Sequence, residues 1–275
     1  MPGDVIRILS DIHFGDRASL VGRLGQLRPL FDGIDRLVLN GDTLDTRPGP
    51  NPEHSTACRD EVLDFFPRSV PTVTYLTGNH DADLSPHHRL DLARGQVFVT
   101  HGDIVFENIV PWSNDAALIG ERIATQLAAA PASEREELDR RLFIWRQVAA
   151  SIPQRHQSER HGLKHLMRYV ADTAWPPTRV LRVLQAWRNE PRLAAALARR
   201  HRPTARYVVT GHIHRPGIWR DPNGVIVINT GSYTPPLGAT CVDLTPGRLL
   251  VRSVKRQRGE FRPGRVLAEF PLAES

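Results

Sequence analysis

The chain has little cysteine and no long apolar run, and these absences exclude several classes of protein. Only two cysteines occur among its 275 residues, Cys58 and Cys241, and they lie far apart. We therefore expect no disulfide framework, and a reducing, cytoplasmic setting is predicted. No window of about 18 apolar residues exists, so no membrane-spanning helix is predicted. The first residues lack a basic stretch followed by an apolar one, so no signal peptide is expected.

The composition is that of a globular protein with an uneven distribution of charge. Hydrophobic residues make up 40% and charged residues 24%, which excludes a disordered class. The net charge is +6, and residues 106–205 hold 16 Lys and Arg against 10 Asp and Glu, so the whole excess lies there. Such a segment suits a phosphate-bearing substrate, an anionic lipid surface or nucleic acid, or it is simply a solvated arginine-rich surface.

Short β-branched apolar runs bounded by Gly, Asp or Pro predict strands in two parts of the chain. The expected strands are 5–9, 36–39, 72–76, 97–100, 206–210, 225–228, 239–242 and 249–252. Helices are expected over 20–30 and around 62–66, where apolar residues recur every three to four positions. This alternation of strand and helix predicts an α/β fold.

The stretch from about 111 to 202 predicts helices instead. A capping-box pattern at 133–136, Ser-Glu-Arg-Glu, precedes an apolar face that contains Leu142 and Trp145. Further apolar faces at 163–170, 180–187 and 193–197 suggest about four helices. We therefore predict a core domain, 1–105 and 206–275, interrupted by a helical insertion, 106–205. The insertion holds four of the five tryptophans, which are Trp112, Trp145, Trp175 and Trp187.

Five polar clusters follow five of the predicted strands. They are Asp11-Ile12-His13, Gly41-Asp42-Thr43-Leu44-Asp45, Gly78-Asn79-His80-Asp81, His101-Gly102-Asp103 and Gly211-His212-Ile213-His214. Residues i and i+2 of an extended segment point the same way, so such pairs can share one ion. Strand ends at one sheet edge are close in space. Asp, Asn and His suit Mn, Fe, Co or Zn, and the lack of cysteine argues against a structural zinc site.

Three of these residues are expected to have particular roles. Asp42 follows a glycine that allows a sharp turn, so its carboxylate can bridge two metals at the strand tip. Asp45 is better placed to orient a ligand from behind. His80, beside the acidic Asp81, is a candidate for acid/base catalysis.

The order D-x-H, G-D-x-x-D, G-N-H-D, H and G-H-x-H resembles the calcineurin-like metallophosphoesterase family between Asp11 and His214. The run 228–233 is also similar to the strand and turn that follow G-H-x-H in that family. The resemblance implies a four-layer α/β/β/α sandwich, here with an all-helical insertion. It implies two divalent ions, manganese first, with iron, zinc or cobalt as the other candidates. One ion would be bound by Asp11, His13, Asp42 and His214, and the other by Asp42, Asn79, His101 and His212, with Asp42 bridging.

The function implied is hydrolysis of a phosphodiester or pyrophosphate bond by a metal-bound hydroxide. His80 would contact the phosphate or protonate the leaving group, with Asp81 helping to set its orientation. A phosphomonoesterase, a nuclease and a non-catalytic metal-binding scaffold are the alternatives. The complete ligand set disfavours the scaffold, and the lack of a stacking-aromatic platform makes nucleic acid an unfavoured partner.

The helical insertion between H-G-D and G-H-x-H is similar to that of the UDP-diacylglucosamine pyrophosphohydrolase branch, although that branch has Arg where this chain has His80. Both ends of the insertion lie near the metals, so we expect a lid or cap. Its apolar faces either pack together or take an acyl chain, so a nucleotide- or lipid-linked substrate and a peripheral membrane contact are open. A protein Ser/Thr phosphatase is disfavoured because G-N-H-E is G-N-H-D here. Candidate ligands of an anionic head group are Arg155, Arg160, Arg168, Arg179 and Arg182.

Overall fold

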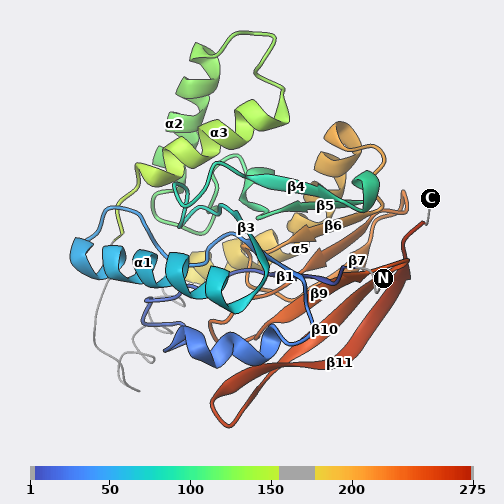
Figure 1. The fold of residues 1–275 in the computed structure, drawn as a ribbon. Coiled ribbons are helices and arrows are strands. Elements are labelled where there is room, and N and C mark those ends of the chain that lie inside the picture. Colours follow the sequence, from blue (N-terminus) through green and yellow to red (C-terminus); the bar gives the residue numbers. More distant parts are fainter. Residues whose placement is uncertain (1–3, 155–176, 274–275) are drawn as a thin grey trace.

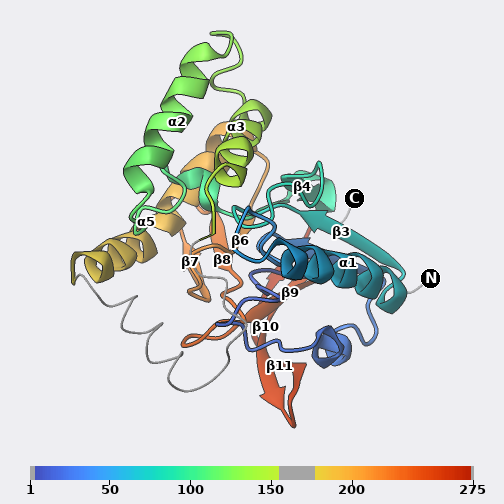
Figure 2. The same ribbon diagram turned by 90° about the vertical axis from the view of Figure 1, so that its left-hand side faces the viewer.

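Two β-sheets packed face to face form the centre of the fold, and helices cover their outer faces (Figure 1). The computed structural model describes residues 4–154 and 177–273. A second view shows the helices α2, α3 and α5 on one side of the sheets and α1 on the other (Figure 2). The predicted four-layer α/β/β/α arrangement is therefore confirmed.

The first sheet has the strand order β11-β10-β9-β1-β2-β3. Its strands are β1 (Ile6–Leu9), β2 (Arg36–Asn40), β3 (Thr72–Leu76), β9 (Thr240–Thr245), β10 (Arg248–Gln257) and β11 (Glu260–Pro271). Strands β1, β2 and β3 are parallel, whereas β9, β10 and β11 pair antiparallel with their neighbours. Three strands therefore bring their C-terminal ends to one edge of this sheet.

The second sheet has the strand order β4-β5-β6-β8-β7. Its strands are β4 (Arg89–Leu92), β5 (Val97–Thr100), β6 (Tyr207–Thr210), β7 (Gly217–Arg220) and β8 (Ile226–Asn229). Strands β5, β6 and β8 are parallel, and β4 and β7 run antiparallel at the two edges. This sheet thus also carries a set of aligned C-terminal ends.

The core between the sheets is built from alternate residues of the central strands. Ile8 and Val38 of the first sheet and Val99, Val209 and Ile228 of the second are fully buried in one cluster. Because successive side chains of a strand point to opposite faces, the intervening residues face the helices. Burial of each such aliphatic side chain stabilises the folded state by about 1.5–3 kcal/mol. The strands that carry the site are therefore held firmly in place by the core.

The outer layers differ in origin. Helix α1 (Pro52–Ser69) and the 3-10 helix η1 (Leu24–Leu30) cover the first sheet. Helices α2 (Ala116–Ala129), α3 (Leu138–Ala150) and α5 (Pro177–His201) pack on the outer face of the second sheet, against Phe98, Val208 and Val227. Short 3-10 turns, η2 (Ala93–Gly95) and η3 (Asp103–Val105), flank β5. The described helices of 106–205 thus form the fourth layer, and the division into core and insertion stays a prediction.

The start of α3 was predicted wrongly. The capping-box pattern at 133–136 is a linker, and the helix begins at Leu138. The reason is that Arg135 donates through Nε to the carbonyl of Ala130 (3.0 Å) and through Nη2 to that of Ala128 (2.8 Å), which satisfies carbonyls at the end of α2. Helix α2 itself was not predicted.

Other elements also differ from the prediction. The expected helices at 180–187 and 193–197 are one helix, α5, which continues through Pro191 because Ala194, Ala195 and Ala198 behind it are fully buried. The expected helix at 163–170 lies outside the described residues. Strands β4, β7 and β11 were missed, and β11 contains Pro263 and Gly264 at an irregular stretch of its pairing with β10. Among the described helices, none is long and apolar enough to cross a membrane.

Candidate metal centre

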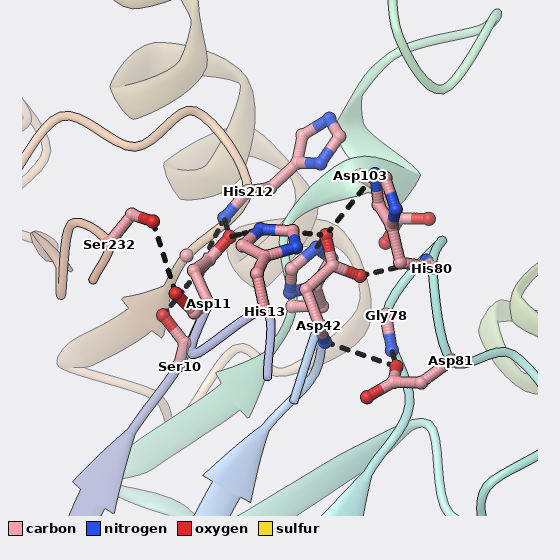
Figure 3. A network of polar contacts seen from close by, with 12 residues as sticks. Ser10, Asp11, His13, Asp42, Gly78, His80, Asp81, Asp103, His212 and Ser232 are labelled. Atoms are coloured by element: carbon pink, nitrogen blue, oxygen red, sulfur yellow. Dashed lines mark hydrogen bonds and ion pairs between the residues drawn. The ribbon is translucent and has the colours of Figure 1, made fainter. Parts of the chain in front are cut away.

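The five polar clusters meet at one end of the two sheets (Figure 3). Asp11, Asp42 and Asn79 follow β1, β2 and β3, while His101 and His212 follow β5 and β6. Parallel strands produce this arrangement because their C-terminal ends share an edge. The potential ligand atoms form three groups, each within 4.8 Å: Asp11–His13–His214, His13–Asp42–His80 and Asp42–His101–His212.

The first group surrounds one oxygen of Asp11. Its Oδ1 lies 3.2 Å from Nε2 of His214 and 3.9 Å from Nε2 of His13. The two imidazole nitrogens are 3.0 Å apart. The backbone N–H of His212 donates to both carboxylate oxygens, at 3.0 and 3.1 Å, which holds the carboxylate in place. Three of the four residues predicted for the first ion therefore place potential ligand atoms within a small volume, and their binding of an ion stays a prediction.

The second group, His13–Asp42–His80, shares His13 with the first group and Asp42 with the third. Oδ1 of Asp42 accepts a hydrogen bond from the backbone N–H of His80 (2.8 Å), which leaves Oδ2 facing the centre. That oxygen lies 3.3 Å from Nε2 of His101 and 3.8 Å from Nε2 of His13. His101 and His13 belong to different predicted ligand sets. Oδ2 of Asp42 is thus the atom at which the two sets meet.

The backbone at five of the seven predicted ligands is left-handed. These are Asp11, His13, Asp42, His212 and His214, with φ between 49° and 70°. Non-glycine residues held in this region cost about 1–3 kcal/mol each and occur mainly at functional sites. Glycines permit the packing around them, since a Cβ on Gly78 would lie 2.1 Å from Oδ1 of Asp42 and one on Gly211 2.1 Å from Oδ2 of Asp11. The loops are therefore shaped to aim side chains, at a cost in backbone energy.

Three of the histidines have their outer nitrogen engaged. The pairs are His101 Nδ1 with the carbonyl of Asn40 (3.0 Å), His212 Nε2 with the carbonyl of Ile109 (2.9 Å) and His214 Nδ1 with Oγ1 of Thr234 (3.1 Å). A metal-bound histidine is usually held in this way, with its other nitrogen bonded to a carbonyl or hydroxyl. The remaining nitrogen of each ring is left for an ion.

The electrostatics favour a cation at this centre. Burial lowers the pKa of His13 and of His212 to about 4, so both present lone pairs at neutral pH. Burial opposes charge on His101 too, but the carboxylates of Asp42 and Asp11 outweigh it and raise the pKa of His101 to about 10. The negative charge that holds this proton would hold a divalent ion equally well.

Two buried polar atoms support the prediction of two metal ions. Oδ1 of Asn79 and Nε2 of His101 are inaccessible to solvent and make no hydrogen bond within the described part of the chain, although Nε2 of His101 has an ion-pair contact with Oδ2 of Asp42 at 3.3 Å. Such an atom costs about 1–3 kcal/mol unless something satisfies it. A divalent ion bound to both would do so, and oxygen and imidazole ligands suit manganese, iron or zinc. The residues present fit the implied ions, and the assignment of each ligand stays a prediction.

The prediction that Asp81 orients His80 is wrong. The ring of His80 is held by Asp45, whose Oδ2 lies 2.8 Å from Nδ1. Arg47 binds the same carboxylate through Nε (3.0 Å) and Nη2 (2.6 Å), and this Nη2 also lies 2.8 Å from Nδ1 of His80. Asp45 was predicted to orient a metal ligand, and in the structure its carboxylate contacts His80, which is not one of the seven predicted ligands.

Asp81 joins two loops instead. Its fully buried carboxylate accepts backbone N–H groups from Gly78 (2.6 Å), Asp42 (3.1 Å) and Thr43 (2.7 Å). Burial and the nearby Asp42 carboxylate raise its pKa to about 6. The motif spacing placed Asp81 next to His80, but in this conformation adjacent side chains point apart. A direct catalytic role for Asp81 therefore has no geometric support here.

Two buried charges near the centre were not predicted. Arg146 on α3 is 3% exposed, and Glu190 on α5 is fully buried. Each lies on the apolar face of its helix, Arg146 beside Leu142 and Trp145, and Glu190 between Ala186 and Ala194. A charge on an apolar helical stripe is the sequence signal that could have found them.

Glu190 provides a test by pH. Its Oε1 accepts a hydrogen bond from Oγ1 of Thr210 (2.7 Å), and Oε2 has no hydrogen-bond partner in the described residues. Burial raises its pKa from 4.5 to about 7, against the opposing effects of Thr210, Asn229 and Arg215. The folded state then binds this proton more tightly than the unfolded state, so the free energy of unfolding falls as pH rises between these values.

We expect the Glu190→Gln variant to remove that dependence. Wild type and variant should have similar free energies of unfolding near pH 4.5, and the variant should be more stable by about 3 kcal/mol at pH 8. Urea unfolding in chelator at several pH values measures the difference, and other titrations cancel between the two proteins. A difference that does not change with pH would contradict this account.

The tryptophans of 106–205 mostly serve packing. Trp145 is buried and donates through Nε1 to the carbonyl of Phe106 (3.0 Å). Trp187 donates to the carbonyl of Ile213 (2.8 Å), and the half-buried Trp112 ring lies 5.3 Å from that of His212. Trp175, Arg155, Arg160 and Arg168 lie outside the described residues, whereas Arg179 is half-buried and Arg182 exposed.

The chain is similar to known proteins of one family. A family model described as calcineurin-like phosphoesterase matches residues 5–216. No curated protein sequence matches the chain. Similar solved structures include a dimetal phosphatase from Danio rerio, with 14% identity, full coverage of both chains and a TM-score of 0.45. A Vps29 variant from Entamoeba histolytica has 11% identity, 98% and 99% coverage and a TM-score of 0.45. A predicted phosphoesterase from Streptococcus pneumoniae has 15% identity, with 98% of this chain and 99% of that chain covered, and a TM-score of 0.41. Because the family model covers more than half of the chain, including all seven predicted metal ligands, the chain belongs to the calcineurin-like phosphoesterase family.

Proposed function

We propose that the protein hydrolyses a phosphodiester or pyrophosphate bond at a centre of two divalent metal ions, with manganese as the preferred metal. The observation that carries the proposal is the position of Asp42 Oδ2, between His101 Nε2 at 3.3 Å and His13 Nε2 at 3.8 Å. One carboxylate oxygen between two sets of nitrogen ligands suits a pair of ions with a shared ligand. Family membership supports a metal-dependent phosphoesterase activity.

The ions, when bound, supply Lewis acidity toward the phosphoryl oxygens and acidify the attacking water. His80 is placed to supply a proton. Its Nε2 lies 4.0 Å from Oδ2 of Asp42, and its side chain is 28% exposed, so substrate can reach it. Burial and the Arg47 cation act to lower the pKa of His80, but Asp42 and Asp45 outweigh them and raise it. A raised pKa favours the protonated ring, which suits protonation of the leaving oxygen.

We also propose that the substrate is a small nucleotide- or lipid-linked phosphate ester and that residues 106–205 border its site. The support is local, because Ile109 and Trp112 contact His212 and Trp187 contacts the residue between His212 and His214. A cytoplasmic location is part of the same proposal. Within the family, the UDP-diacylglucosamine pyrophosphohydrolase branch stays a prediction.

Metal-reconstituted hydrolysis tests the proposal. The protein would be stripped with chelator and assayed with Mn, Fe, Co, Zn or Mg against a phosphomonoester, a phosphodiester, a nucleotide pyrophosphate and single-stranded DNA. We expect manganese to restore hydrolysis, with the diester or the pyrophosphate preferred. Preference for the monoester or for DNA would replace the proposed substrate class. No turnover with any metal and any of these substrates would contradict the proposed activity.

A further inference from the structure

Arg146 reaches the metal centre from the helical layer. Its guanidinium forms a two-pronged ion pair with Asp103, through Nη1 to Oδ2 and through Nη2 to Oδ1 (2.8 Å). Its Nε donates to Oγ1 of Thr77 (2.9 Å). Both Arg146 and Asp103 are buried, at 3% and 0% exposed. Every nitrogen of the guanidinium thus has a partner in the interior.

The two partners belong to loops that carry predicted ligands. Thr77 directly follows β3 and stands two residues before Asn79, and Asp103 stands two residues after His101, beyond the end of β5. Strands β3 and β5 lie in different sheets. One guanidinium therefore ties the two sheets together where they supply Asn79 and His101, both predicted ligands of the same ion.

His212, the other histidine predicted to bind that ion, is also contacted by the helical segment. Nε2 of His212 donates to the carbonyl of Ile109, and Glu190 accepts from Thr210, two residues before His212. The other predicted ion is supported by a different part of the chain. Oγ of Ser232 donates to the carbonyl of Asp11 (3.1 Å), and Thr234 contacts Nδ1 of His214 (3.1 Å). The contacts of Arg146 itself lie only with the loops that carry Asn79 and His101.

We propose that Arg146 is a positioning residue that sets the affinity of one metal ion only, the ion predicted at Asn79, His101 and His212. The inference rests on the proposed two-metal function. An arginine is required because its planar fork can bind a carboxylate with two nitrogens and a hydroxyl with a third, which a lysine cannot do. Residues that hold metal ligands from behind typically change metal affinity by about 10- to 100-fold when replaced.

Manganese titration of the Arg146→Met variant tests the proposal. Wild-type apoprotein, followed by the loss of the free Mn²⁺ electron paramagnetic resonance signal, should bind two ions. The variant should bind one ion as wild type does and the other about 10- to 100-fold more weakly. The matched control is Arg7→Met, because Arg7 also forms a buried two-pronged pair, with Asp243 at 2.6 and 2.7 Å, but touches no ligand loop. We expect the control to lose stability and keep both affinities.

Further variants keep the inference falsifiable if Arg146→Met does not fold. The Arg146→Lys variant keeps a cation beside Asp103 and loses the fork, so it should fold and show a smaller loss at the same ion. The double variant Arg146→Met with Asp103→Asn leaves no unpaired buried charge, so stability should recover without recovery of affinity. Equal weakening of both ions, or unchanged binding of both, would overturn the inference. A wild-type protein that binds fewer than two ions would instead overturn the proposed function.

Discussion

Replacing Asp42 with asparagine is expected to abolish binding of both ions and to lower hydrolysis by about 1,000-fold or more. Oδ2 of Asp42 lies between His101 and His13, so loss of its charge affects both ligand sets. Metal ions contribute several kcal/mol to the stabilisation of charge in a phosphoryl transition state, and each 1.4 kcal/mol is tenfold in rate. Manganese titration and initial rates of hydrolysis measure the two effects.

The control for Asp42→Asn is Asp32→Asn, the same change at an exposed residue. It should leave metal binding and rate unchanged. Oδ1 of Asp42 accepts from the backbone of His80, and an asparagine oxygen can accept the same bond, so the variant should fold. A folded Asp42→Asn protein that bound two ions with wild-type affinity would show that this oxygen does not bridge them.

Replacing His80 with asparagine is expected to lower kcat by about 100- to 10,000-fold while both ions stay bound. The reason is the loss of an imidazole that can supply a proton and whose pKa is raised by Asp42 and Asp45. The p-nitrophenolate anion is a weak base and can depart without receiving a proton. An alkoxide is a strong base and needs one. The loss of rate should therefore be much larger for an alkyl ester than for a p-nitrophenyl ester.

The exposed His87 offers a matched control, since His87→Asn should change neither rate. Manganese titration of His80→Asn separates a loss of chemistry from a loss of metal. Equal loss for both leaving groups would rule out proton transfer by His80, and loss of an ion would make His80 a ligand, which the group His13–Asp42–His80 also allows geometrically.

The central strands, and the clustering at their ends of the residues predicted as ligands, could be predicted from the sequence because these signals are local. A β-branched run followed within a few residues by Asp, Asn or His marks a strand end, and parallel strands bring such ends together. The partner of His80 could not be identified in the same way. Asp81 is adjacent in sequence, whereas Asp45 is adjacent in space, and a left-handed backbone at the neighbouring ligands makes side-chain direction unpredictable from spacing.

The helical segment shows the other limit of sequence analysis. Its apolar faces indicated packing but not the sheet face on which the helices pack. Arg146 and Glu190 have partners at Asp103 and Thr210, which are 43 and 20 residues away along the chain. Such long-range polar contacts produce no periodic pattern in the sequence. The only sequence signal is a charged residue that interrupts the apolar face of a helix.

Anomalous diffraction from crystals grown in manganese tests the central claim most directly. The account predicts two anomalous peaks about 3.5–4 Å apart, the distance typical of two-metal sites. One should lie against Asp11, His13 and His214, the other against Asn79, His101 and His212, and both should contact Asp42. A single peak, or two peaks that do not share Asp42, would contradict the account.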